Sequence, residues 1–277
     1  MDLLHTVPDL RQRLSRESSI VLVPTMGNLH AGHLALVDIA KKRGGCVAAS
    51  IFVNRLQFEP GGDFERYPRT LERDCQLLEK AGCDVVFAPD EREMYPVAQE
   101  IQVTPPHVAA TLEGEFRAGH FQGVCTVVAK LFNIFRPQAA VFGKKDYQQL
   151  AVIRAMERQL DFGIDIVGAE TIREPDGLAM SSRNGYLSAE ERKEAVRLNQ
   201  NLRLIVDRIR EGTHAFMALE GATMDDLKRH GWAPDFIAVR RRADLATPGP
   251  RDRELVVLGA ARLGKTRLID NLEVDAP

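Results

Sequence analysis

The sequence predicts an α/β protein in which residues 1–175 form a doubly wound parallel sheet and residues 176–277 form a smaller α+β domain. Short apolar runs such as SIVLV, CVAASIFV and DVVFA alternate with segments of helical periodicity, which is typical of βαβ units with helices on both faces of the sheet. The runs are apolar at nearly every position, as strands buried on both faces are. After Pro175 a charged helical segment precedes three alternating segments, which indicates antiparallel strands with one face in water.

Local signals give the order of elements in the first 175 residues. Thr6 is placed to cap a helix, Gly44 is a natural helix end, Pro24 ends a strand, and a helix stops before Pro137. Residues 54–68 are polar and rich in Gly and Pro, so we expect a loop there, of a length that is often functional. The expected strands lie at residues 19–23, 46–53, 84–88, 139–142 and 164–167, and the expected helices at 7–14, 31–43, 69–81, 121–135 and 146–160.

The C-terminal part begins with a capping box, Ser188 and Glu191, which predicts a long charged helix to about Arg210. A further helix is expected near residues 224–230, and the strands are FIAVRRRADL, ELVVLGAARL and TRLIDNLEV. Residues 259–266 (GAARLGKT) satisfy the P-loop expression, but the residues after them alternate like a strand. A P-loop requires a full helix at that point, so we reject a nucleotide site there.

Composition excludes several classes of function. The 277 residues carry a formal net charge of −2, and the densest basic run, Arg240 to Arg242, is interpreted as a solvated face, so we expect no nucleic-acid partner. The N-terminus is too charged for a signal peptide, and no apolar run approaches the ~18 residues needed to cross a bilayer. Four cysteines without a C-x-x-C pair fit free thiols in a reducing compartment, so we expect a cytoplasmic protein with no membrane partner.

The segment VPTMGNLHAGH carries the clearest functional signal. It joins the first buried strand to its helix, and in an open parallel sheet ligands bind at such carboxyl ends of strands. The helix N-terminus suits phosphate, Gly27 and Gly32 let a ligand approach the main chain, and His30 and His33 add two hydrogen-bond donors. A histidine pair that only caps the helix, or half of a metal site, is the alternative, but no third ligand stands at metal-site spacing nearby. The pattern favours a nucleotide site, and it is the signature shared by H-x-G-H nucleotidylyltransferases and class I aminoacyl-tRNA synthetases.

Five motifs in order extend this resemblance to one family. PTMGNLHAGH, FVNRLQF, YPRT, FGKKDYQQL and GLAMSSRN together resemble the pantothenate synthetase (pantoate–β-alanine ligase) family. The resemblance runs from about residue 20 to residue 190 and resumes weakly at AARLGKTRLIDN. It implies a Rossmann-like sheet of the H-x-G-H nucleotidylyltransferase type and an enzyme that joins pantoate to β-alanine through a pantoyl adenylate, releasing diphosphate and then AMP. It also implies ATP as substrate, Mg²⁺ bound with ATP, and a homodimer.

The resemblance assigns roles residue by residue. His33 matches the catalytic histidine, and His30 and Lys145 are expected to act with it on the triphosphate. Gly143 and Asp146 match the positions that hold the ribose, and Ile172 matches a position that packs beside the adenine through its backbone. The full set expected to bind ATP is Met26, Gly27, Asn28, Leu29, His30, Ala31, Gly32, His33, Gly143, Lys144, Lys145, Asp146, Ile172, Met180, Ser181, Ser182 and Arg183.

The acid and amine sites follow from the same motifs. Gln57 and Gln149 match the pair that binds pantoate, and an amide suits a substrate with hydroxyls and a carboxylate because it both donates and accepts. Gln57 also matches the β-alanine contact, and Asn54 and Arg117 lie in matching segments. No protein metal cage is expected, because phosphate oxygens and water hold Mg²⁺ in such sites. Pro and Gly meet at residues 174–177, where we expect a hinge that lets the second domain close over ATP.

Two residues depart from the family pattern, which usually has Pro at Arg55 and Glu at Lys144. The first bears on the conformation of the loop. Lys144 either adds positive charge near the phosphates or faces solvent. A small residue is also usual in the family at Lys265.

Three alternatives compete with a ligase. An H-x-G-H nucleotidylyltransferase that stops after adenylyl transfer is opposed by FVNRLQF and KKDYQQL, which match the acid-binding segments. A non-catalytic ATP-binding regulator is opposed by the intact His30, His33, Lys145, Gln57 and Gln149. An RNA-binding synthetase fragment is opposed by the net charge and by the lack of an anticodon-type domain.

Overall fold

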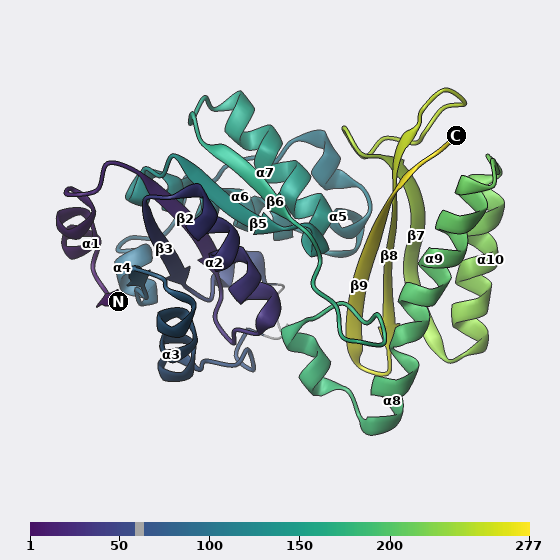
Figure 1. Cartoon of the computed structure of the whole chain (residues 1–277), viewed down its shortest axis with the longest axis horizontal. Coiled ribbons are helices and arrows are strands. Elements are labelled where there is room, and N and C mark those ends of the chain that lie inside the picture. Colours follow the sequence, from purple (N-terminus) through teal and green to yellow (C-terminus); the bar gives the residue numbers. More distant parts are fainter. Residues whose placement is uncertain (59–63) are drawn as a thin grey trace.

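A six-stranded parallel sheet and a three-stranded antiparallel sheet stand side by side in the computed structural model, which describes residues 1–58 and 64–277 (Figure 1). The strand order in the first sheet is β1-β4-β3-β2-β5-β6, and all neighbouring pairs are parallel. Its strands are β1 (Asp2–Leu4), β2 (Ile20–Thr25), β3 (Cys46–Ile51), β4 (Val85–Phe87), β5 (Ala139–Gly143) and β6 (Asp165–Ala169). The predicted doubly wound α/β fold is therefore confirmed.

The direction of winding reverses between β2 and β5. From β2 the chain moves outward through β3 and β4 to one edge, and it later returns to β5 on the other side of β2. The carboxyl ends of β2 and β5 are therefore neighbours at the switch point, where open α/β sheets bind ligands. The two most informative motifs, PTMGNLHAGH and FGKKDYQQL, leave the sheet at these two ends.

Helices cover both faces of this sheet because successive strand residues point to opposite sides. Leu22 of β2 faces a core built with α1, α6 and α7, whereas Val21 and Val23 face a core built with α2 and α3. The helices are α1 (Val7–Leu14), α2 (Ala31–Arg43), α3 (Leu71–Ala81), α6 (His120–Phe135) and α7 (Tyr147–Gln159).

Most predicted boundaries in this part agree with the structure. Thr6 caps α1 by accepting a hydrogen bond from the Asp9 main chain, and α2 ends at Gly44. One expectation was wrong, since β2 runs through Pro24 to Thr25. Short elements without an apolar period escaped the sequence pattern: β1 at the sheet edge, α4 (Glu91–Met94), α5 (Glu113–Phe116), and the single turns η1 (Arg55–Gln57), η2 (His107–Ala110), η3 (Lys144–Asp146) and η4 (Ser182–Tyr186). Residues 59–63 of the predicted loop 54–68 lie outside the described residues.

The three C-terminal strands pair antiparallel, as predicted, and form a meander. They are β7 (Trp232–Arg241), β8 (Glu254–Leu263) and β9 (Thr266–Asp275). In Figure 1 α9 (Val196–Arg210) and α10 (Phe216–Arg229) cover the face turned away from the larger sheet. The expectation of one wet face was wrong, because Ala238, Val256 and Leu258 pack with Leu112 and Tyr147 of the first part of the chain.

Two further sequence expectations have structural outcomes. The capping box of Ser188 and Glu191 is present, but it opens the short α8 (Ala189–Glu194), and the long predicted helix is interrupted at Ala195. The rejection of a P-loop is confirmed, because Gly264 and Lys265 form the tight turn between β8 and β9. No helix among the described residues combines the length and the apolar character needed to cross a membrane.

The basic run at the end of β7 is neutralised locally. Arg240 pairs with Glu220, Arg241 with Asp244, and Arg242 with Asp275. These partners leave no continuous basic surface at this run.

Candidate active site

A buried carboxylate on α3 shapes the turn between β2 and α2. Asp74 is fully buried, and its two oxygens accept hydrogen bonds from the main-chain N–H groups of Asn28 at 2.8 Å and Leu29 at 2.9 Å. The turn requires a left-handed main chain at Gly27 (φ 81°) and Asn28 (φ 50°), residue types that tolerate this conformation better than most. Asp74 was not singled out from sequence, because its partners are about 45 positions away in the chain.

The two histidines of the motif cap α2 with their rings. Nδ1 of His30 accepts a hydrogen bond from Gly32 N–H at 3.1 Å, and Nδ1 of His33 accepts one from His30 N–H at 3.3 Å. A main-chain N–H can only donate, so neither Nδ1 carries a proton and each neutral ring carries its proton on Nε2. Capping therefore leaves both Nε2–H groups available as donors, and the capping and phosphate-binding interpretations are compatible.

Both rings are uncharged in the neutral pH range. Burial, and then the Lys145 ammonium, lowers the pKa of His30 to about 4. Burial, and then His30, lowers the pKa of His33 to about 3. In this state the histidines donate hydrogen bonds but bring no positive charge, so the fixed cation of the site is Lys145.

The GKKD segment after β5 is attached to the C-terminal sheet. The side-chain amide of Asn271 on β9 donates to the main-chain oxygens of Lys144 and Lys145, at 2.9 Å each. Lys145 Nζ lies 4.0 Å from a carboxylate oxygen of Asp146. Burial opposes ionisation of Asp146, but Lys145 and Arg183 outweigh it and hold its pKa below the usual value.

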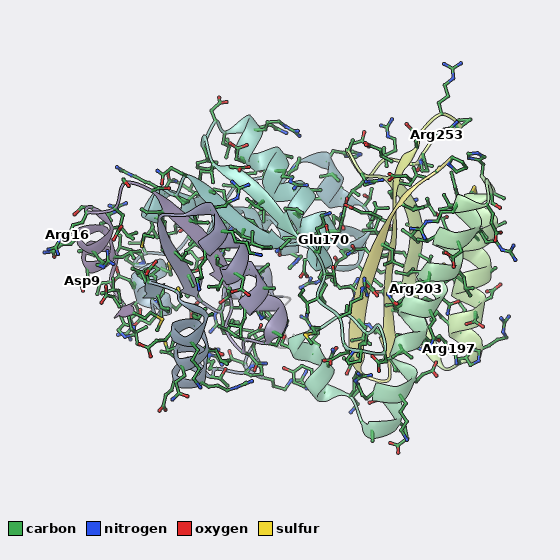
Figure 2. All side chains as sticks on the ribbon, in the orientation of Figure 1. Asp9, Arg16, Glu170, Arg197, Arg203 and Arg253 are labelled. Carbon is green, nitrogen blue, oxygen red and sulfur yellow. The ribbon has the colours of Figure 1, made fainter. Side chains whose placement is uncertain are left out.

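Lys144 is paired with other carboxylates than Lys145. Its ammonium lies 2.5 Å from Glu170 and 2.9 Å from Glu273, and Figure 2 shows Glu170 in the region between the two sheets. Tyr147 also donates to Glu273 at 2.7 Å. The lysine that departs from the family pattern thus takes part in an ion-pair cluster between β6 and β9.

Gln57 is held by a buried asparagine. Asn54 Nδ2 donates to Gln57 Oε1 and to the Gly123 carbonyl, both at 3.1 Å, while Asn54 Oδ1 accepts from Tyr95 at 2.7 Å. Gly123 is required here because a Cβ would lie 2.2 Å from the Leu56 oxygen. Asn54 therefore has few hydrogen-bonding groups left for a ligand, and its position indicates that it orients Gln57.

A hydrogen bond from His120 fixes the main chain of Gln57. His120 accepts from Arg117 Nη1 at Nε2 (2.9 Å), so its proton is on Nδ1, which donates to the Gln57 carbonyl at 3.0 Å. Burial, and then Arg117, lowers the pKa of His120 to about 3. His120 was missed from sequence because it begins an otherwise apolar helix and belongs to none of the quoted motifs.

Arg55 is the other residue that departs from the family pattern, and its side chain contacts the outer side of the segment that carries Gln57. Its guanidinium lies 3.0 Å from Glu91 and 3.2 Å from Glu65, and it stacks 4.0 Å above the Phe64 ring. These contacts restrict a segment where the family usually has a proline.

The segment Met180–Arg183 lines the site from beyond β6. Met180 N–H donates to the Ile172 carbonyl at 3.0 Å, and the Ser181 hydroxyl accepts from Arg183 N–H at 3.2 Å. Tyr67, from the YPRT motif, is buried beside this segment. Burial raises the pKa of Tyr67, although a hydrogen bond with Ser182 opposes the shift, so the side chain remains a phenol.

Most predicted residues line one cavity of about 210 Å³ at the switch point. From the predicted set it is lined by Met26, His30, Gly32, His33, Asn54, Gln57, Gly143, Lys145, Asp146, Gln149, Ile172, Met180, Ser181, Ser182 and Arg183. The remaining predicted residues, Gly27, Asn28, Leu29, Ala31, Lys144 and Arg117, are outside this lining. Gly27 and Leu29 are buried in the turn that Asp74 holds, which suits support of the site better than contact with a ligand. The described residues contain no group of three His, Cys, Asp or Glu side chains that could hold a metal ion.

Comparisons with known proteins agree with this geometry. A family model described as pantoate-beta-alanine ligase matches residues 2–273. The pantothenate synthetase of Nitrosospira multiformis is 56% identical over 274 residues, covering 99% of this chain and 98% of the relative. That of Thiobacillus denitrificans is 58% identical over 275 residues, covering 99% of this chain and 97% of the relative.

Two solved structures have the same fold over nearly the whole length. The pantothenate synthetase from Thermus thermophilus superposes with a TM-score of 0.94 at 45% identity, covering 99% of this chain and 100% of the other. A pantoate-beta-alanine ligase from Francisella tularensis, complexed with beta-gamma ATP and beta-alanine, superposes with a TM-score of 0.84 at 30% identity, covering 98% of this chain and 97% of the other.

Proposed function

This chain belongs to the pantoate-beta-alanine ligase family, and from that premise we propose how its residues divide the work of the reaction. The enzyme condenses pantoate with β-alanine to form pantothenate, with ATP as a substrate. We propose that the reaction proceeds through a pantoyl adenylate. A free carboxylate is a poor electrophile, so the acid must be activated before an amine can attack it.

One observation supports this route most strongly. His30, His33 and Lys145 line the same cavity as Gln57 and Gln149. The first three groups suit an anionic phosphate chain, and the two amides suit an acid that carries hydroxyls. An enzyme that only transfers an adenylyl group would not need the two amides beside the phosphate-binding groups.

In the proposed first step, Gln57 and Gln149 hold pantoate with its carboxylate toward the α-phosphorus of ATP. A carboxylate oxygen forms a bond to the α-phosphorus, and the bond from that phosphorus to the bridging oxygen of diphosphate breaks. The leaving diphosphate takes the electron pair. Lys145 and the two histidine donors stabilise the charge that develops on the phosphate oxygens, a role for which fixed groups in a partly buried site are well suited.

In the proposed second step, the neutral amine of β-alanine attacks the acyl carbon of the adenylate. The bond from that carbon to the phosphate oxygen breaks, AMP leaves with the electron pair, and the nitrogen loses a proton. Gln57, held rigid by Asn54 and His120, guides the amine. The guanidinium of Arg117 donates to His120 at 2.9 Å and lies 3.7 Å from Glu113, and its other N–H groups can bind the amino acid's carboxylate.

The proposed ATP contacts are those predicted residues that line the cavity. Gly143 and Asp146 hold the ribose, Ile172 packs beside the adenine, and Ser181, Ser182 and Arg183 contact phosphate oxygens. Met26 and Gly32 line the cavity at the start of α2, where the positive end of the helix dipole favours an anion. Mg²⁺ is proposed to arrive with ATP, held by phosphate oxygens and water.

Three further properties are proposed on the family resemblance. The chain works as a homodimer, which light scattering would test. It functions in the cytoplasm, which suits its free cysteines Cys46, Cys75, Cys83 and Cys125. Residues 1–175 and 176–277 act as two domains, with a hinge at residues 174–177.

The deciding experiment is pyrophosphate exchange into ATP with Mg²⁺ and without an amine, across a panel of carboxylic acids. We expect exchange that depends on pantoate and that stops when β-alanine drains the adenylate to pantothenate and AMP. Exchange with another acid only, or with none, would overturn the adenylate route.

A further inference from the structure

A second, larger cavity adjoins the proposed reaction site. It measures about 580 Å³ and lies between the segment after the hinge, the start of α9, and the β8–β9 turn. It shares Lys145, Asp146, Ser181 and Arg183 with the smaller cavity, so a ligand can extend from one to the other. The roles proposed above leave most of its walls unused.

Positive charge predominates in its lining. Three carboxylates line the cavity, and each lies beside a cation: Glu113 is 3.0 Å from Arg267, Asp270 is 2.8 Å from Arg173, and Asp146 is 4.0 Å from Lys145. The cationic side chains in the lining are Arg66, Arg117, Lys145, Arg183, Arg262, Lys265 and Arg267. A concave wall with this excess concentrates anions.

Three of these cations have no counter-charge in the described part of the chain. No hydrogen bond or ion pair joins the side chain of Arg66, Arg262 or Lys265 to any residue in 1–58 or 64–277. In addition, Nη2 of Arg267 is buried without an acceptor among these residues. Unpaired cations that converge on a cavity are the counterpart expected for a polyanion.

The β8–β9 turn is fixed in position over this cavity. Gly264 has φ 57°, and a Cβ at this residue would lie 2.0 Å from a carboxylate oxygen of Glu191. The other oxygen of Glu191 accepts from Ser188 N–H at 2.8 Å in the cap of α8. The turn therefore rests closely against α8, which defines the main-chain position of the adjacent Lys265.

We propose that this cavity takes the β- and γ-phosphates of ATP and then the released diphosphate, with Lys265, Arg262 and Arg66 as its outer cations. The proposal rests on the adenylate reaction proposed above, which releases a diphosphate beside Lys145. Lys265 stands where the family usually has a small residue, so it would give this chain a phosphate contact of its own. The GKT sequence that fails as a P-loop then contributes a lysine to phosphate binding from a β-turn.

Direct binding of inorganic diphosphate to the full chain, measured by titration calorimetry with Mg²⁺, tests this assignment. We expect Lys265→Ala and Arg262→Ala each to weaken binding by about 3–10-fold, which is the loss of one charge-assisted contact in a hydrated site. The Michaelis constant for diphosphate in pantoate-dependent exchange should rise by the same factor. Lys228→Ala removes an exposed lysine of α10 outside the cavity. It should leave the diphosphate affinity and the Michaelis constant for diphosphate within about twofold of the wild-type values.

Unchanged diphosphate affinity in Lys265→Ala, Arg262→Ala and the double variant would overturn the assignment. Thermal unfolding of each variant checks that the turn remains folded, and Lys265→Arg should restore the affinity. The measurements distinguish a failure of the diphosphate cavity from a failure of the adenylate route. Wild-type chain that binds diphosphate through Lys265 but shows no pantoate-dependent exchange would refute the adenylate route and leave the diphosphate cavity standing.

Discussion

Asn271 on β9 donates a hydrogen bond of 2.9 Å to the main-chain oxygen of Lys145, across the boundary between the two sheets. A second bond of the same length reaches Lys144. Asn271 is buried and its strand is hydrogen-bonded to β8 along its full length. The C-terminal sheet thus sets the position of the main chain that presents the site's fixed cation.

The change Asn271→Ala should lower kcat by about tenfold through displacement of Lys145, because small misplacements of a catalytic group cost about this much or more. Asn201→Ala is the matched control. Asn201 is also buried and its amide also donates twice, to Arg197 and Asp226, but on α9 away from the cavity. Both variants should lose a few degrees of Tm, on the order of 1–2 kcal/mol. Equal kcat values for the two variants would show that Asn271 has only a structural role.

Asp74→Asn should destabilise the turn that carries His30. The substituted amide must point one N–H group at Asn28 or Leu29, where the carboxylate now accepts from both. The free energy of unfolding should fall by about 1–3 kcal/mol, the cost of an unmade buried hydrogen bond, and turnover should fall with it. Urea unfolding and steady-state kinetics measure the two effects.

Asp84→Asn provides the comparison for this prediction. Asp84 also accepts from a main-chain N–H, that of Val47 at 2.8 Å, but at the opposite end of the sheet. Asp84→Asn should keep its turnover and most of its stability, because the amide oxygen can still accept the single bond from Val47 N–H. The same result for Asp74→Asn would mean that the carboxylate does not orient the turn for catalysis.

His33→Asn separates the two roles of that ring. An asparagine oxygen can replace Nδ1 in the cap of α2, but it supplies no donor where Nε2–H lies. We expect turnover to drop about 100-fold, as for loss of one donor at a developing charge, with Tm nearly unchanged. His33→Ala should lose the same activity and also about 1 kcal/mol from the lost cap. A variant His33→Asn with normal turnover would leave the histidine a capping role only.

The local parts of this architecture could be predicted from sequence, and the long-range contacts could not. The β2–α2 turn and the segment after β5 are short motifs between an apolar strand and a helix, so their position at the carboxyl edge follows from the pattern. The partners that hold them, Asp74 and Asn271, lie on elements whose contacts depend on how distant segments pack. The burial of both faces of β8 did have a signal, since VVLGAA is apolar at nearly every position, as in a strand with no wet face.

The hinge expected at residues 174–177 lies in a tight turn that is bound to β9. Arg173 forms a two-point ion pair with Asp270 at 2.8 and 2.9 Å and also donates to the Gly177 carbonyl. Closure over ATP should tighten this turn further, so limited proteolysis at residues 174–177 should slow when ATP and pantoate are added. Arg173→Ala should speed cleavage in the absence of substrates. A cleavage rate that does not respond to substrates would count against closure about this segment.

Acid should destabilise the protein through its buried histidines. Burial and Arg117 lower the pKa of His120 to about 3 in the folded chain, whereas an unfolded histidine has a pKa of about 6.5. Between these two pH values His120 is protonated in the unfolded state but not in the folded state. The contribution of His120 to the free energy of unfolding is therefore fully present above pH ~6.5 and is lost as pH falls toward about 3. His30 and His33 shift in the same direction, and the charges around His120 that reinforce or oppose its shift are Arg117, Asp146 and Arg183.

His120→Asn should reduce this acid sensitivity. The asparagine amide can replace Nδ1–H in the bond to the Gln57 carbonyl, but it cannot take up the proton that the unfolded histidine binds. The variant should be less stable than wild type at pH ~7.5, because Arg117 loses its acceptor, yet its Tm should fall less between pH ~7.5 and pH ~5. His214→Asn, in the exposed segment before α10, controls for replacement of an imidazole. An undiminished fall in Tm for His120→Asn would show that His120 does not contribute to the acid sensitivity.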